Sequence, residues 1–116
     1  MTDEALQERR RRAALNQSLF RRINESINRL HEGSAFTEYA CECTQKTCEA
    51  VISLSADEYE EVRRDSTHFV VARGHVLHDA EHVVRETSRY QVVEKVGIAA
   101  EVATKLDPRT ATETTL

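Results

Sequence analysis

Cys41-Glu42-Cys43-Thr44-Gln45-Lys46-Thr47-Cys48 is the stretch that decides the fold, because it carries all three cysteines of the 116-residue chain. Cys41 and Cys43 flank the single residue Glu42, and four residues separate Cys43 from Cys48. The short polar residues between Cys43 and Cys48 are typical of a turn, which can bring three thiols to one point. The stretch therefore predicts a metal-binding knuckle. Glu42 is expected to point outward from it, without a catalytic role.

The donor set favours zinc, which prefers thiolate and imidazole ligands in a tetrahedral arrangement. His75 is the expected fourth ligand, because it follows Gly74 at the end of a predicted strand, where the backbone can turn sharply. His78, His82, a water molecule or a carboxylate are the alternatives for that position. Four protein ligands would close the coordination shell, as in structural zinc sites. The predicted ligands are Cys41, Cys43, Cys48 and His75.

Buried or redox-active thiols are the alternative interpretation of the cysteines. The C-x-C-x4-C spacing is less specific than the doubled C-x2-C pattern of many zinc sites, although three cysteines suit no complete disulfide scheme. No apolar segment follows the Arg9–Arg12 run, so we expect no secretion signal and a cytoplasmic protein with reduced thiols. No stretch approaches the roughly 20 apolar residues of a membrane helix. His68 precedes a predicted strand and is equally free to be an ordinary surface residue.

Residues 3–32 predict one long helix, because neither proline nor glycine occurs before Gly33. An apolar stripe with helical spacing runs along it, formed by Leu15, Leu19, Ile23, Ile27 and Leu30. A helix of this length exceeds what a small sheet can cover. We therefore expect part of the stripe to pack on the sheet and the rest to bind a partner helix or a second copy of the chain.

The remaining sequence indicates an α+β fold, with a small antiparallel sheet that carries the zinc knuckle. Ser55 and Glu58 have the spacing of a capping box, which predicts a helix that begins at Ser55 with Tyr59 and Val62 facing inward. Strands are predicted on both sides of the cysteines within 34–55, and at 69–72, 82–85 and 90–96. A last helix is predicted at 98–106, with Ile98, Val102 and Leu106 on one side.

Three parts of the chain are expected. Residues 1–33 form the long amphipathic helix, and residues 34–106 form the zinc-binding α+β domain. Residues 107–116 are rich in threonine and are expected to be a disordered tail.

Four motifs give the chain a resemblance to a known group of proteins. They are Cys41-Glu42-Cys43 with Cys48, Glu58-Tyr59 with Val62-Arg63, Phe69-Val70-Val71 with Gly74-His75, and Val92-Val93-Glu94-Lys95. In this order they resemble a group of small uncharacterised bacterial proteins, mainly from high-GC Gram-positive bacteria. The resemblance covers roughly residues 36–97 and supports treating the cysteines and Gly74-His75 as one unit. It implies no substrate, reaction or partner.

These patterns favour a non-enzymatic, zinc-stabilised adaptor or regulatory protein that acts through its N-terminal helix. The expected partner is a protein or a second copy of the chain, with no membrane contact. One alternative is a nucleic-acid-associated zinc protein that uses the Arg9–Arg12 run. The net charge of −4 argues against general binding of nucleic acid, because such binders usually have a basic face. Another is a thiol-based redox or metal sensor. An enzyme is not expected, because no pattern combines a nucleophile, a base and an open metal position.

Overall fold

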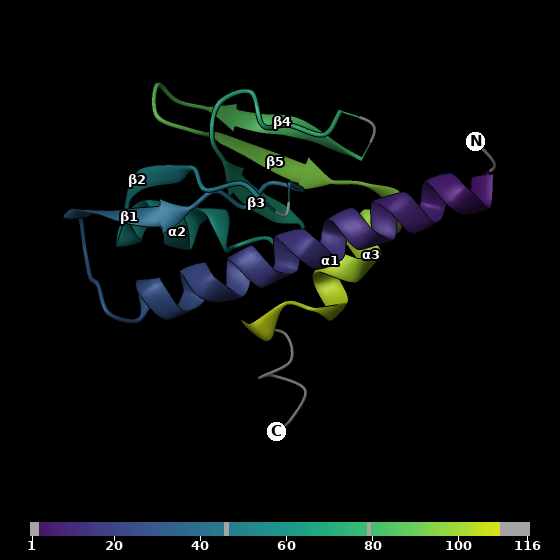
Figure 1. Cartoon of the computed structure of the whole chain (residues 1–116). Coiled ribbons are helices and arrows are strands. Elements are labelled where there is room, and N and C mark those ends of the chain that lie inside the picture. Colours follow the sequence, from purple (N-terminus) through teal and green to yellow (C-terminus); the bar gives the residue numbers. More distant parts are fainter. Residues whose placement is uncertain (1–2, 46, 79, 110–116) are drawn as a thin grey trace.

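The structure, a computed structural model, describes residues 3–45, 47–78 and 80–109. It has the α+β architecture that the sequence predicts, with two small antiparallel sheets beside a long N-terminal helix (Figure 1). The elements are α1 (Asp3–Asn28), β1 (Phe36–Ala40), β2 (Val51–Ser55), α2 (Ala56–Val62), β3 (His68–Val71), β4 (Glu81–Glu86), β5 (Gln91–Lys95) and α3 (Gly97–Lys105). Within the described residues, no helix is both long and apolar enough to cross a membrane.

The two sheets are the β1–β2 hairpin and a three-stranded sheet with the order β3-β5-β4. Glu42, just after β1, connects them. Its backbone N–H donates to the Val70 carbonyl at 2.8 Å, and the Val70 N–H donates to the Glu42 carboxylate at 3.0 Å. The cysteine-bearing segment therefore runs beside the outer edge of β3.

The helix α2 begins where its capping box predicts. The Ser55 hydroxyl accepts from the Glu58 N–H at 3.1 Å, and the Glu58 carboxylate accepts from the Ser55 N–H at 3.0 Å. Two donors that the first turn would leave unpaired are thereby satisfied. Tyr59 and Val62 face the core, as predicted, and the Tyr59 ring stacks on Tyr39 at 4.9 Å.

Helix α1 buries a different face from the one its apolar stripe suggests. We expected part of the stripe to cover the sheet, but only Ile27 packs against the core. Leu15 is 43% exposed, Leu19 59% and Ile23 50%. The buried positions of α1 are instead Ala14, Gln17, Ser18, Arg21, Asn24 and Glu25.

The polar face is buried because the surface beneath it offers backbone polar groups, which need hydrogen-bond partners once they are removed from water. Asn24 Nδ2 donates to the Ala40 carbonyl at 2.8 Å, and Asn24 Oδ1 accepts from the Ala40 N–H at 2.7 Å. Arg21 donates to the carbonyls of Ser66 and Ala103 at 2.6 and 2.7 Å. Leucine side chains at these positions would leave the carbonyl and N–H groups unsatisfied. These bonds place α1 in the same folded unit as the strands.

The C-terminal helix is buried most deeply at small residues. Of Ile98, Val102 and Leu106, which were predicted on one side of this helix, Val102 packs against the cluster that contains Ala99, whereas Leu106 is 40% exposed. Ala99 and Ala103 are the fully buried residues. Small side chains suit this position, because α3 packs closely along α1 (Figure 1).

The chain remains ordered beyond the point where a tail was expected. Asp107 is buried and forms an ion pair with Arg63. Arg109 pairs with Glu25 at 2.9 Å and with Glu60 at 2.7 Å. The expectation of disorder from residue 107 is therefore wrong for residues 107–109, because these charges fasten the segment to α1 and α2. Residues 110–116 lie outside the described part of the chain.

Candidate metal centre

The four residues predicted as ligands lie together in space. Cys41 and Cys43 follow β1, Cys48 precedes β2, and His75 lies in the turn after β3. Each offers one ligand atom, and these four atoms all lie within 4.8 Å of one another. Two loops distant in sequence therefore form a single group that could hold a metal ion.

The distances within this group match tetrahedral coordination. His75 Nδ1 lies 3.5 Å from Cys41 Sγ and 3.6 Å from Cys48 Sγ. In a tetrahedral zinc site, with Zn–S bonds of about 2.3 Å and Zn–N bonds of about 2.0–2.1 Å, sulfur and nitrogen are about 3.5 Å apart. An ion can therefore enter with little movement of these side chains, and Nδ1 is the histidine atom that faces it.

Backbone hydrogen bonds fix the two loops. The Cys41 N–H donates to Ala50 at 3.0 Å, which continues the hairpin pairing, and the Cys48 N–H donates to Gln45 at 3.0 Å, which closes the turn. The Ala72 N–H donates to Cys41 Sγ at 3.1 Å. Hydrogen bonds of this kind to a ligand atom orient it and tune its basicity.

Gly74 enables the turn that presents His75. Its φ of 87° lies in the left-handed region, which residues with a Cβ adopt only with strain. Its N–H donates to Gln91 Oε1 at 2.9 Å, and the His75 N–H donates to Ala72 at 3.0 Å. Gly74 therefore forms the sharp turn before His75 that the sequence predicts.

The thiols differ in their exposure to water. Cys41 and Cys43 are each 1% exposed, whereas Cys48 is half-buried and His75 is exposed. Burial raises the pKa of both the Cys41 and the Cys43 thiol. Without a cation these thiols stay protonated at neutral pH, and a bound cation reverses this because a coordinating thiol is deprotonated.

No protein-family model, curated protein or solved structure matches the chain.

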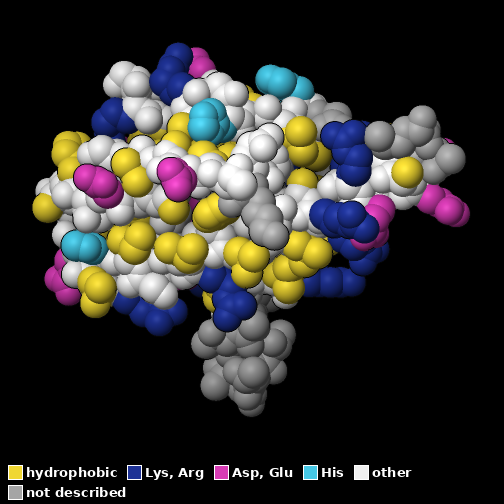
Figure 2. Space-filling model, in the orientation of Figure 1, with side chains coloured by type: hydrophobic (Ala, Val, Ile, Leu, Met, Phe, Trp, Pro, Cys, Tyr) yellow, Lys and Arg dark blue, Asp and Glu magenta, His cyan; other side chains and the backbone are white. Residues whose placement is uncertain are grey.

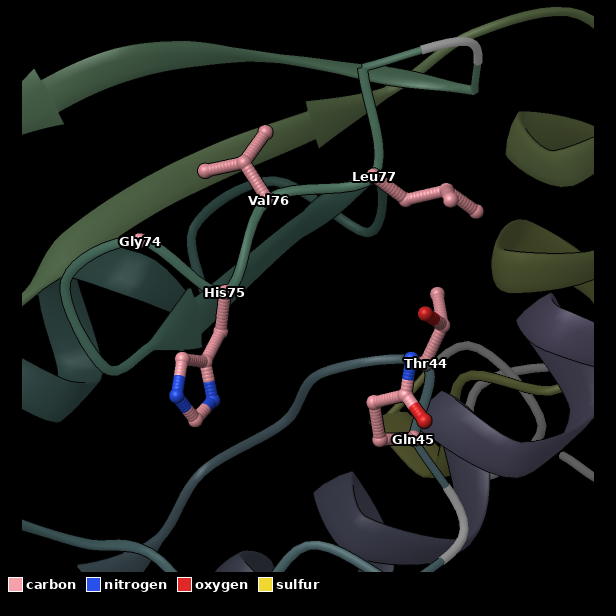
Figure 3. Close-up of a pocket in the computed structure, with 6 residues that line it drawn as sticks. All are labelled: Thr44, Gln45, Gly74, His75, Val76 and Leu77. Atoms are coloured by element: carbon pink, nitrogen blue, oxygen red, sulfur yellow. The ribbon is translucent and has the colours of Figure 1, made fainter.

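A hollow of about 200 Å³ adjoins the metal group (Figure 3). The ring of His75 lies on one side of it, across from Thr44 and Gln45. Its remaining lining residues are Gly74, Val76 and Leu77. Pockets for small-molecule ligands are usually about 300–1,000 Å³, so this hollow is small for an organic substrate.

Glu42 does not point outward, as we expected of a residue between two ligands. It is fully buried, and its carboxylate accepts from Asn24 Nδ2 at 2.9 Å, from the Tyr59 hydroxyl at 2.7 Å and from the Val70 N–H. Burial raises the pKa of this carboxyl group, whereas the hydrogen bonds from Asn24, Val70 and Tyr59 oppose that rise. The Glu42 carbonyl accepts from Gln17 Nε2 at 2.9 Å. Residue 42 therefore connects the metal group to α1.

One signal for this connection is present in the sequence of α1. Gln17, Arg21 and Asn24 recur at helical spacing on one side of α1, and a polar row at such spacing can be buried if the opposing surface is polar. That condition could not be read from α1 alone.

The alternative histidines lie elsewhere. His82 contacts Glu94 rather than a cysteine, and His78 is exposed and outside the metal group. His68 is half-buried and also contacts Glu94.

Proposed function

We propose that the protein is a non-enzymatic adaptor or regulatory protein that holds one zinc ion and binds a protein partner through the outer face of α1. The proposal of a protein partner rests on one observation, which is the face that α1 turns toward the rest of the protein. This helix docks mainly through polar side chains and leaves its apolar stripe, apart from Ile27, exposed to water.

Zinc is the ion that the donor set supports. Three thiolates and one imidazole in tetrahedral positions suit zinc, whereas Mg²⁺ and Ca²⁺ prefer oxygen ligands. Four protein ligands leave no coordination position for a substrate, which is the property of a structural site. The role of the ion would then be to fasten the 41–48 loop to the turn at Gly74 and His75.

The outer face of α1 has the features of a docking surface. Apolar side chains run along α1, with Lys and Arg side chains beside them (Figure 2). A shallow hollow of about 280 Å³ lies between α1 and the end of α3, lined by Leu15, Ser18, Leu19, Arg22 and Leu106. Exposed apolar grooves rimmed by polar residues mark interaction sites in many proteins.

The charges beside this groove favour an acidic partner. Arg22 lines the groove and is exposed, and Arg29, just after the end of α1, is also exposed. An amphipathic helix with leucines at i, i+3 and i+7 and glutamates at its flanks would complement both the apolar row and the arginines. A second copy of α1 would place arginines against arginines, so a different acidic protein fits better.

The nucleic-acid alternative has less support than a protein partner. Glu8 lies 3.8 Å from Arg11 and 3.3 Å from Arg12, and Arg10 is half-buried. Two members of the Arg9–Arg12 run are thus already paired with a carboxylate, in the manner of ordinary i, i+3 and i, i+4 helix pairs.

The zinc part is tested by elemental analysis of untagged protein beside Cys43→Ser and His75→Ala. We expect about one zinc per chain in the parent, loss in the serine variant and weaker retention in the alanine variant. A parent protein purified without any metal would overturn this part.

The docking part is tested with a synthetic, labelled amphipathic helix that carries leucines at i, i+3 and i+7 and glutamates at the flanks. We expect binding that weakens at least about tenfold in Leu19→Asp and that falls with salt. Val84→Asp is the matched control, because Val84 is similarly exposed but lies on β4. Equal binding of a lysine-flanked helix, or self-association of the parent during sedimentation, would contradict the acidic-partner proposal.

A further inference from the structure

A row of titratable side chains crosses the three-stranded sheet at one end. Glu94 on the central strand β5 is directly opposite His68 on β3 and directly opposite His82 on β4. Directly opposed residues on antiparallel strands project from the same face of a sheet. The two imidazoles therefore flank one carboxylate.

His68 and Glu94, together with Asp65 from the preceding turn, place ligand atoms close enough to share an ion, and His82 contacts the same carboxylate. His68 Nε2 lies 3.1 Å from one oxygen of Glu94, and His82 Nε2 lies 3.2 Å from the other. Asp65, in the turn before β3, places an oxygen 3.7 Å from His68 Nε2. Metal–ligand bonds of about 2.0–2.2 Å in a tetrahedron separate neighbouring N and O ligands by about 3.3–3.6 Å.

We propose that Asp65, His68, His82 and Glu94 form a second binding site, for a divalent first-row transition-metal ion. The ligand atoms of Asp65, His68 and Glu94 already lie within 4.8 Å of one another. His82 is 58% exposed, so its ring is free to turn toward an ion held by the other three.

The chemistry of the four side chains selects the class of ion. Two imidazoles favour Zn²⁺, Cu²⁺, Ni²⁺ and Co²⁺ over Mg²⁺ and Ca²⁺, which prefer oxygen ligands. Two carboxylates and two neutral imidazoles also balance the charge of a divalent ion. This donor set contains no thiolate, so it differs from the cysteine centre.

The local structure holds the acidic ligand in place. One oxygen of Asp65 accepts from the Thr67 N–H at 3.0 Å and from the Thr67 hydroxyl at 2.7 Å. The other oxygen is the one that faces His68. A carboxylate oriented by its own hydrogen bonds loses less side-chain freedom when it binds an ion.

This second site is more open than the cysteine centre. The Asp65 side chain is 49% exposed and that of Glu94 is 35% exposed, whereas Cys41 and Cys43 are buried. Water or a small ligand can therefore reach an ion here, and the ion exchanges with the solution. The site is thus suited to reversible binding.

The experiment uses the full chain with its cysteine centre already loaded with one zinc ion, titrated with Co²⁺ and followed by calorimetry and absorption. We expect one further equivalent to bind without a thiolate-to-cobalt charge-transfer band. The zinc content measured after desalting should remain at one per chain. Affinity for this equivalent should fall at least about tenfold in Glu94→Gln and in His82→Asn.

His78→Asn is the matched control, because His78 is an exposed histidine outside the row, and its affinity for cobalt should equal that of the parent. No second equivalent in the parent, or undiminished binding in Glu94→Gln, would overturn the proposal. Cobalt uptake with release of zinc and a charge-transfer band would also overturn it, since the metal would then be exchanging at the cysteines.

Discussion

At the scale of single residues, Asn24 makes three hydrogen bonds through one buried side chain. The Asn24 side-chain amide forms hydrogen bonds with the N–H and the carbonyl of Ala40 and with the carboxylate of Glu42. All these atoms lie where α1 contacts the start of the cysteine-bearing loop, residues 41–48, called the metal loop below. Removing one partner of a buried hydrogen bond costs about 1–3 kcal/mol, because the other partner stays desolvated. We predict that Asn24→Ala lowers the free energy of unfolding by about 2–3 kcal/mol.

Urea unfolding of the zinc-loaded protein measures this loss. Asn16→Ala is the control, because Asn16 is half-buried on the same helix but is not among the fully buried residues of α1. Its effect should stay below about 1 kcal/mol. Equal losses in the two variants would show that the amide of Asn24 makes no special contribution.

Glu58 gives the stability of the protein a defined pH dependence. A hydrogen bond from Arg89 lowers its pKa, partial burial opposes this, and the Ser55 N–H lowers it further. A carboxyl group whose pKa is lower in the folded state stabilises the fold above its ordinary pKa. That contribution disappears as the pH falls through the folded-state value. We predict that Glu58→Gln lowers stability by about 1 kcal/mol at pH 7.

This difference from the parent should shrink as the pH falls below about 4, where the parent carboxyl also becomes protonated. Urea unfolding of both proteins between pH 7 and pH 3 measures it. Glu101→Gln, at an exposed position on α3, is expected to follow the parent throughout. A difference that grows on acidification would have the wrong sign for this explanation.

At the scale of elements, local signals were sufficient where neighbours in sequence determine the structure. The capping box placed the start of α2, and runs of strand-forming residues separated by turns placed the strands. The metal group was also predictable, since three cysteines lie within eight residues and Gly74 marks the turn that carries His75. The identity of the ion stays a proposal, because geometry defines a group of ligands rather than a metal.

The orientation of α1 could not be predicted from its own pattern. A hydrophobic stripe usually faces the core, and here Leu19 and Ile23 are among the exposed residues. The deciding partner is the backbone around residues 40–42, whose hydrogen-bonding groups become apparent only once β1 and the metal loop are in place. The row at Glu94 was missed for a similar reason, since it depends on the register of three strands.

The coupling between α1 and the metal loop leads to a prediction for this helix. Cys41 and Cys43 flank Glu42, so an ion bound by both cysteines fixes the backbone that α1 contacts. Removing the ion with a chelator and reductant should raise amide exchange in residues 14–25 at least about tenfold, equivalent to about 1.4 kcal/mol of lost local stability. Hydrogen-exchange mass spectrometry of the two forms measures this.

The β4–β5 hairpin is the internal control, because it contains none of the four ligands. Its exchange should change less than that of α1. Unchanged protection of residues 14–25 in the metal-free protein would mean that α1 docks independently of the ion.

At the scale of the whole molecule, several buried sites are polar rather than apolar. Arg21, Glu42, Glu81 and Lys95 are each at most 2% exposed, and Lys95 forms an ion pair with Glu81 at 2.9 Å. Buried ion pairs recover little more than their own desolvation, so they are weak sources of stability. In a chain of 116 residues, an ion that bridges two loops should then account for a large share of the net stability.

We therefore predict that stability depends on zinc concentration and on pH together. A free zinc concentration of 100 times the dissociation constant should stabilise the folded protein by about 2.7 kcal/mol, or roughly 10 °C in Tm. The effect should decrease as the pH falls, because zinc binds thiolates and burial raises the pKa of the Cys41 and Cys43 thiols. Calorimetric scans at several zinc concentrations and pH values measure both trends. Cys43→Ser should lose the zinc-dependent shift while His78→Asn keeps it, and a parent Tm that is independent of zinc would mean that the ion does not support the fold.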